Sequence, residues 1–434
     1  MIRKLRLTSL LSLLAALFMS TGCTTTATNP TAEREIVLPL ADVHFHASNY
    51  AMQGIHLKQF IDEYMDKTQG LRPVTRSVIM PLPLQQRWDS FENYQIDIKS
   101  KGITAGPNYY IGPKADLYYY SFIDAMYAKQ YLALSKDDQF KLDLMITGFN
   151  PMDVYAAQHI KRAVLTYPGA FDGIGEFTIH KEIVSDKLAG DAITDTKAPT
   201  VALPPDVYSQ SDTVSLYADS LTRLLKEAGD IGLVAMLHND IYLVEVSHDG
   251  ELKARHPDKS YEKGLIDLCS RVKGTKIIWA HTGLGRFVEP QSDHLQIVSR
   301  ILDACPDWYT DISWDLVQDY ILDPKPGMPS TEEWREFLNK YHDRVLWGSD
   351  DVIYSRNKFD FDKKEVELGS LMTPSQYDND VHRMDKFKST LKFSESLDYD
   401  NYRAIFTQAR EKVRGWESEH ANDNVWDLTT PITK

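Results

Sequence analysis

The sequence has little cysteine, little glycine and proline, and no excess of positive charge, and each shortage excludes a class of protein. Only 3 of the 434 residues are cysteine, which is too few for a disulfide framework. Glycine (22) and proline (20) fall well short of the share, about a quarter of the chain, that is typical of collagen-like or low-complexity architectures. The net charge of −14 repels polyanions, so we expect no nucleic-acid partner.

The remaining composition is that of a globular protein. Hydrophobic residues make up 43% of the chain, charged residues 25% and aromatic residues 11%. Length alone suggests two or three domains. A (β/α)8 barrel of about 250 residues, which insertions can extend beyond 400, is also compatible with this length.

The N-terminus has the layout of an export signal. Basic residues at positions 3, 4 and 6 precede an apolar run over 7–18, which is too short for a bilayer that needs about 20 residues. The segment Met19-Ser20-Thr21-Gly22-Cys23 resembles the lipobox of bacterial lipoproteins, although Ser20 replaces the usual leucine and leaves plain signal-peptidase cleavage open. We therefore predict a signal peptide over 1–23, a flexible tether over 24–36, and export to the cell envelope or periplasm with a lipid anchor on Cys23.

Two further cysteines lie in the body of the chain. An oxidising compartment would allow Cys269 and Cys305 to pair. Two cysteines in so large a domain are more typical of buried free thiols, which is what we expect, with pairing left open.

Short β-rich segments alternate with segments of helical periodicity, which indicates parallel βαβ units. Eight strands favour a closed barrel, so we predict a distorted (β/α)8 TIM barrel over 37–420 and a C-terminal tail over 421–434. Long insertions are expected after strands 2 and 4, over about 81–140 and 183–211. The segment after Asp351, through a helix near 401–417, should close the outer layer. The predicted strands are 35–42, 77–80, 142–147, 173–177, 232–237, 276–280, 308–312 and 344–347.

The first strand ends in a His-x-His pattern. Alternation along a strand places Asp42, His44 and His46 on one face and Val43 and Phe45 on the other. Two imidazoles on the same side of a strand are suited to chelating one cation such as zinc.

Four more potential ligands come at the ends of later strands. Glu176, His238, His281 and Asp350 each follow an apolar run. A buried carboxylate or imidazole is costly unless it is paired or binds a metal. We therefore expect these side chains to converge with His44 and His46 on one cation site.

The sequence at this point resembles the amidohydrolase superfamily. The motifs that carry the resemblance are the strand-one His-x-His, Ala280-His281-Thr282-Gly283 and Trp347-Gly348-Ser349-Asp350. The resemblance implies that His44, His46, His238 and Asp350 hold a divalent metal, and Zn²⁺ is the expected ion. It makes His281 either a ligand of a second ion or a contact to the bound water. Glu176, in a Gly-Glu pair like that of TatD-type nucleases, either bridges two ions or contacts substrate.

This resemblance implies a metal-dependent hydrolase that cleaves an amide, ester, lactone or related bond of a small molecule with metal-activated water. Asp350 would be the general base and His281 would stabilise the oxyanion. A zinc-dependent non-oxidative decarboxylase, a phosphoesterase and a non-catalytic metal-binding protein are the alternatives. His180, Lys181 and Arg286 are weaker substrate-binding candidates, followed by Asn239, Asp240, Asp315 and Asp351.

Overall fold

The chain divides into two units, Met1–Val37 and Leu38–Lys434. The first unit, which includes the predicted signal, the whole predicted tether and Cys23, lies outside the described residues. The computed structural model describes residues 39–49, 54–65, 73–86, 117–119, 121–181, 216–246, 252–353, 358–360, 365–367, 373–392, 395–397 and 399–425.

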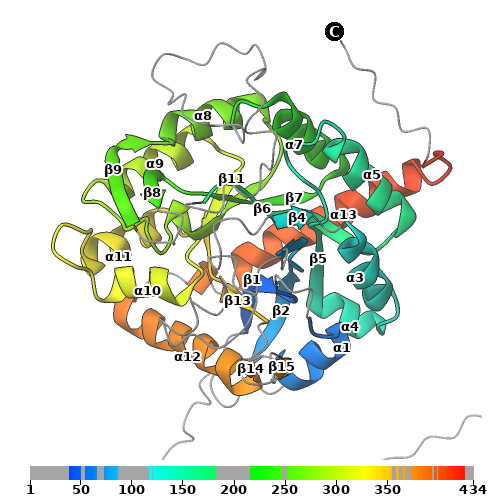
Figure 1. The fold of residues 1–434 in the computed structure, drawn as a ribbon, viewed down its shortest axis with the longest axis horizontal. Helices are drawn as coiled ribbons and strands as arrows, with labels where there is room; N and C mark the ends of the chain where they lie inside the picture. The colour runs from blue at the N-terminus through cyan, green and yellow to red at the C-terminus, as the bar shows by residue number, and fades with distance from the viewer. Residues whose placement is uncertain are drawn as a thin grey trace, which may run out of the picture. The chain divides into compact units, whose positions relative to one another are not determined.

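The centre of the second unit is a parallel sheet that closes into a barrel (Figure 1). Its strands are β1 (Leu40–His46), β2 (Val74–Ile79), β5 (Leu142–Ile146), β6 (Phe171–His180), β7 (Val234–Asn239), β10 (Ile277–Trp279), β11 (Trp308–Asp311), β12 (Val345–Leu346) and β13 (Asp351–Val352).

The two edge strands of this sheet, β12 and β13, are pieces of one chain segment. β12 pairs with β11 and β13 pairs with β1. Between them, Val43 N donates to Trp347 O at 3.1 Å and Asp350 N donates to His44 O at 2.8 Å. The eighth strand therefore joins the seventh to the first, and the predicted distorted (β/α)8 barrel is confirmed.

Amphipathic helices surround the strands (Figure 1). In α7 (Asp219–Ile231), buried residues recur every three to four positions, among them Leu221, Leu224 and Ala228, and the helix ends at Gly232 with φ 95°. No helix in the described part of the chain is long and apolar enough to cross a bilayer. The other helices of this layer are α1 (Leu57–Phe60), η1 (Ile61–Met65), α3 (Phe122–Leu132), α4 (Lys136–Lys141), α5 (Ala156–Thr166), α8 (Glu262–Arg271), α9 (His294–Ala304), α10 (Asp315–Leu322), α11 (Thr331–Lys340) and α12 (Pro374–Leu391).

The last helix, α13 (Asp400–Glu419), closes the N-terminal end of the barrel. Its Arg410 donates to Leu142 O and its Arg414 to Phe171 O, at the first residues of β5 and β6. The expectation that the segment after Asp351 closes the outer layer holds for α12, which packs between α10, α11 and η1, but is wrong for α13. Four α13 residues, Tyr402, Ile405, Phe406 and Ala409, instead join the barrel interior formed by Ala41, Val43, Val78, Met80, Met145, Val234, Met236, Ile278, Ala280 and Leu346.

The connections carry additional small elements. The segment predicted as an insertion after β2 contains β3 (Leu84–Gln86), paired with β4 (Leu117–Tyr119), and then α3 and α4. Residues 87–116 of that insertion and the whole predicted insertion over 183–211 lie outside the described residues. The sequence analysis missed the hairpin of β8 (Tyr242–Val246) and β9 (Leu252–Ser260), the hairpin of β14 (Lys358–Asp360) and β15 (Glu365–Glu367), and the turns η3 (Ala280–Gly283) and η4 (Glu395–Leu397).

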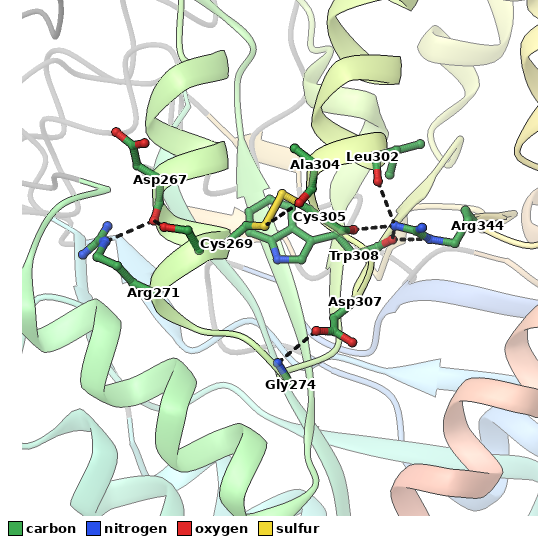
Figure 2. The surroundings of a disulfide bond; sticks show 11 residues. Asp267, Cys269, Arg271, Gly274, Leu302, Ala304, Cys305, Asp307, Trp308 and Arg344 are labelled. Carbon is green, nitrogen blue, oxygen red and sulfur yellow. Dashed lines mark hydrogen bonds between the residues drawn. A yellow bond between two sulfur atoms is a disulfide. The ribbon is translucent and has the colours of Figure 1, made fainter.

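The two cysteines of the barrel form a disulfide (Figure 2). Cys269 lies in α8 and Cys305 directly follows α9, and their Cα atoms are 5.9 Å apart. The expectation of two free thiols is therefore wrong. The physical reason is that α8 and α9 are neighbours in the outer layer, so residues separated by 36 positions meet at the ends of two adjacent helices.

Candidate metal centre

The six predicted ligands come together at the C-terminal ends of the strands. β1 supplies His44 and His46, and β6 supplies Glu176. His238 comes from β7, His281 from the η3 turn after β10, and Asp350 from the bend between β12 and β13. None of the six side chains is more than 12% exposed. The convergence expected from the ends of separate strands is present in the structure.

The alternation expected along β1 is only partly present. His44 and His46 do share a face, but Asp42 accepts hydrogen bonds from Ser349 Oγ at 2.7 Å and Tyr377 OH at 3.0 Å. The prediction that Asp42 shares their face is therefore wrong. The cause is an irregularity in the β1–β2 register between Asp42 and Phe45, which interrupts the two-residue period.

Three donor atoms form an equilateral triangle. His44 Nε2, His46 Nε2 and Asp350 Oδ1 are each 3.2 Å from the other two. Ligand atoms at zinc distances of 2.0–2.1 Å in a tetrahedral arrangement are about 3.3 Å apart. The three atoms thus have the spacing of one face of a zinc tetrahedron, which leaves a fourth position for another ligand.

A second group of donors borders this triangle. Glu176 Oε1 lies 2.8 Å from His238 Nδ1 and 3.6 Å from His281 Nε2. The same carboxylate reaches toward the triangle, with Oε2 at 3.6 Å from His46 Nε2. Glu176 therefore lies between His44 and His46 on one side and His238 and His281 on the other.

The ring nitrogens that face away from the centre are hydrogen-bonded. His46 Nδ1 lies 3.1 Å from Met80 O, and His281 Nδ1 lies 2.9 Å from Ser313 Oγ. His238 is turned the other way, since its Nε2 lies 3.2 Å from Asp240 Oδ1 while its Nδ1 faces Glu176. These contacts fix the ring orientations and leave one nitrogen of each imidazole directed at the cation position.

Asp311 and Ser313, which the sequence analysis missed, support the centre from behind. Asp311 is fully buried at the end of β11, and its Oδ2 lies 3.2 Å from His44 Nδ1. Its Oδ1 accepts hydrogen bonds from His281 N at 2.9 Å and Ser313 Oγ at 2.6 Å. An aspartate near the end of an apolar strand is the same signal that identified the ligands.

The charges around the imidazoles favour a cation. Burial alone would lower the pKa of His44, but Asp350, Asp311 and Glu176 raise it to about 9. His281 Nε2 is buried and has no hydrogen-bond partner. A divalent metal fits this donor set, because it would pair with the carboxylates and accept the lone pairs of the imidazole nitrogens that face it.

The backbone at the centre adopts conformations that L-residues rarely use. φ is +58° at His281, +53° at Thr282 and +55° at Asp350. At Gly348 the strand runs so close to β1 that an added Cβ would lie 2.7 Å from His44 Cβ. Such conformations persist where the surrounding structure enforces them, and they are frequent at functional sites.

The weaker candidates lie in different surroundings. His180 is buried and stacked on Tyr261, with ring centroids 4.1 Å apart, and burial lowers its pKa to about 3. Arg286 is exposed on the loop after η3. Lys181, in contrast, places Nζ 3.5 Å from His238 Nδ1. The substrate roles of His180 and Arg286 stay predictions.

The remaining candidates have local contacts. Asn239 O accepts a hydrogen bond from Trp279 Nε1 at 2.8 Å, and Asp240 orients His238. Asp315 is exposed at the start of α10 and accepts a hydrogen bond from Leu316 N. Asp351 is half-buried, and the neighbouring carboxylates add to burial in raising its pKa.

Comparison with known proteins gives one family match. Residues 198–389 match the model of the family described as "Amidohydrolase". That segment contains His238, His281 and Asp350. No curated protein matches the chain. The family match supports the prediction of an enzyme of the amidohydrolase type.

Several solved structures are similar over most of the chain. An amidohydrolase from Burkholderia multivorans with bound zinc is 10% identical with a TM-score of 0.41, covering 85% of this chain and 99% of that one. A dihydroorotase from Campylobacter jejuni is 12% identical with a TM-score of 0.38, covering 85% and 83%. A 5-carboxyvanillate decarboxylase from Sphingomonas paucimobilis is 11% identical with a TM-score of 0.37, covering 85% and 99%.

Proposed function

We propose that this protein is a metal-dependent hydrolase that cleaves an amide, ester, lactone or related bond of a small molecule. The observation that carries the proposal is the 3.2 Å triangle of His44 Nε2, His46 Nε2 and Asp350 Oδ1. Three protein ligands with an open fourth position are typical of catalytic zinc sites, whereas structural sites are closed by four.

His44, His46 and Asp350 would hold the ion, with Glu176, His238 and His281 beside it. A divalent metal bound there supplies an acidified water, whose pKa falls to about 7, and polarises the oxygen of the bond to be cleaved. The protein contributes the positions of the water and of the bond to be cleaved, because Asp311, Ser313 and Met80 O fix the imidazoles that would hold the ion.

Asp350 is the residue placed to move the proton. While Oδ1 belongs to the triangle, Oδ2 faces the second group of donors, 3.7 Å from His281 Nε2. Burial alone would raise the pKa of Asp350, but His44 and His281 hold it below its ordinary value, so the carboxylate is ionised. Its second oxygen would accept a proton from the attacking water. It would pass that proton to the leaving group.

His281 is placed to stabilise negative charge on the substrate. Its Nε2 is directed into the centre and its Nδ1 is held by Ser313. A fixed donor directed at the position where charge develops lowers the barrier to hydrolysis. The positive φ at His281 keeps the ring in this position on a turn that is itself buried.

Replacement of Asp350 by asparagine tests the assignment. We expect Asp350→Asn to lower kcat/KM by about 100-fold or more, because proton transfer by a positioned group contributes 10²–10⁴-fold. The substrate is found by a screen of the zinc-loaded protein against lactones, N-acyl compounds, phosphoesters and carboxylic acids, with carbon dioxide release recorded. Asp137→Asn, at an exposed position of α4, is the matched control.

Two results would contradict the proposal. Activity of Asp350→Asn within about tenfold of the wild type, at equal metal content, would show that Asp350 is not the base. Release of carbon dioxide without hydrolysis of any substrate would assign the site to decarboxylation instead.

A further inference from the structure

Lys181, which directly follows β6, brings a positive charge to one side of the metal centre. Its Nζ lies 3.5 Å from His238 Nδ1, the nitrogen that faces Glu176. The same Nζ lies 5.9 Å from the centroid of the Trp314 ring, and that ring packs edge to face against His281 at 5.5 Å. The ammonium is thus next to the second group of donors, on the side of Glu176 and His238.

The two halves of the centre differ in what balances their negative charge. The triangle of His44, His46 and Asp350 has its three donor atoms at the spacing that a tetrahedral ion requires. In the other half, His238 Nδ1 and Glu176 Oε1 are 2.8 Å apart, which is a hydrogen-bond distance.

We infer that the centre takes one divalent ion, at the His44–His46–Asp350 triangle, and that the Lys181 ammonium takes the place of a second ion beside Glu176 and His238. The inference rests on the proposed metal-dependent function. It deepens that function in two ways: it gives the number of bound ions, and it gives Lys181, which is not a ligand, the role of balancing negative charge.

The physical reason is electrostatic. A divalent ion coordinated by His238 Nδ1 would lie about 2 Å from that nitrogen, and the ammonium is already 3.5 Å from it. Two cations so close together in a buried site repel each other strongly, since few water molecules screen them. The carboxylate of Glu176 is already paired with His238 Nδ1 at 2.8 Å, so it gains little from a second ion.

Metal stoichiometry tests this inference without an activity assay. The full-length protein is loaded with excess Zn²⁺, desalted, and its zinc and protein contents are measured by mass spectrometry and amino-acid analysis. We expect one ion per chain in the wild type and about two in Lys181→Met, which keeps the length of the side chain and removes its charge. Lys181→Arg keeps the charge, and Lys129→Met changes an exposed lysine of α3, so both should stay at one.

Glu176→Gln adds an independent measurement. Because the ion is held mainly by the triangle, we expect this variant to retain one ion, with a zinc affinity within about tenfold of the wild type by chelator competition. Loss of the ion from Glu176→Gln would overturn the inference, since Glu176 would then be a principal ligand.

The other outcomes separate the inference from the proposed function. Two ions in the wild type, or one ion in a folded Lys181→Met, would overturn the inference and leave the hydrolase proposal standing. No bound ion in the wild type would overturn both. If Lys181→Met does not fold, the wild-type and Lys181→Arg stoichiometries still decide, because two ions in either contradicts the inference.

Discussion

Asp311 holds two of the imidazoles of the metal centre in position. It contacts His44 Nδ1 through Oδ2 and the backbone N–H of His281 through Oδ1. It also binds Ser313 Oγ, which in turn contacts the ring of His281. A single buried carboxylate therefore sets the orientation of one member of the triangle, His44, and of the neighbouring His281.

Replacement of Asp311 by asparagine is expected to weaken metal binding. The amide has nearly the same shape but no charge, so it no longer favours the His44 tautomer with a proton on Nδ1, which leaves Nε2 free as a ligand. We expect Asp311→Asn to lower zinc affinity by about 10–100-fold, measured by competition with a chelator. Asp240→Asn, at the carboxylate behind His238, is the matched comparison, and the inferred single ion at the triangle requires a smaller effect there.

An unchanged zinc affinity of a folded Asp311→Asn would show that the carboxylate is only structural. A change in Asp240→Asn as large as that in Asp311→Asn would place the ion nearer His238 than the triangle.

The sequence predicted the six ligands but not Asp311, which lies behind them. Four ligands were recognised because a polar residue ends an apolar run and two from the His-x-His pattern, and all six converge. Asp311 follows the same rule, but Ile312 was read as the last residue of its strand, so the aspartate appeared to lie within the strand. Hydrogen bonds such as that of Ser313 to His281 depend on the barrel closing and leave no periodic signal.

At the scale of elements, α13 is held against the barrel by a buried charge network. Asp143 of β5 binds Arg410 at 2.7 Å, and Asp172 of β6 binds Arg414 at 2.8 Å. Burial and the neighbouring Asp143 raise the pKa of Asp172 to about 7, although Arg414 and Arg410 act in the opposite direction. Asp172 is thus partly protonated at neutral pH in the folded protein.

This raised pKa predicts that Asp172 makes the stability depend on pH. In the folded state Asp172 keeps its proton up to about pH 7, whereas in the unfolded chain it releases the proton near pH 4. The contribution of Asp172 to the free energy of unfolding is therefore complete in acid and is lost as the pH rises toward and through about 7. We expect the wild-type Tm, relative to Asp172→Asn, to fall between pH 5 and pH 8. Thermal unfolding followed by circular dichroism measures this fall in Tm. A change of about 1 kcal/mol in the free energy of unfolding shifts Tm by roughly 2–4 °C.

Asp400→Asn, at an exposed position of the same helix, should not change the slope of Tm against pH. A wild type and an Asp172→Asn variant with parallel Tm profiles over this range would contradict the assignment of the pH dependence to Asp172.

The periodicity of the 401–417 segment predicted α13 as a helix but not its docking site. Apolar spacing identifies the buried face of a helix and not the surface that covers it. Four residues of that face, Tyr402 to Ala409, pack into the open end of the barrel because β5 and β6 begin with the buried carboxylates that its arginines reach. The outer-layer position expected for this helix was wrong because these tertiary contacts leave no signal in the spacing of its apolar residues.

At the scale of the whole molecule, the disulfide and the N-terminal sequence point to the same compartment. Disulfides form and persist in oxidising environments and are rare in the cytosol. Cys269 and Cys305 are bonded, and Cys23 follows a basic and then apolar N-terminus. We therefore propose that the protein is exported and anchored to the membrane by a lipid on Cys23, with the barrel carried on a tether over 24–36.

The anchor is tested by expressing the full chain in a bacterial host and separating membranes from the soluble fraction. We expect the wild type in the membrane fraction, labelled by a clickable fatty acid, and Cys23→Ser in the precursor form without the label. The double variant Cys269→Ser/Cys305→Ser removes two thiols but keeps Cys23, so it should still carry the label. A wild type that is water-soluble with an unmodified mature N-terminus by mass spectrometry would show that Cys23 carries no lipid.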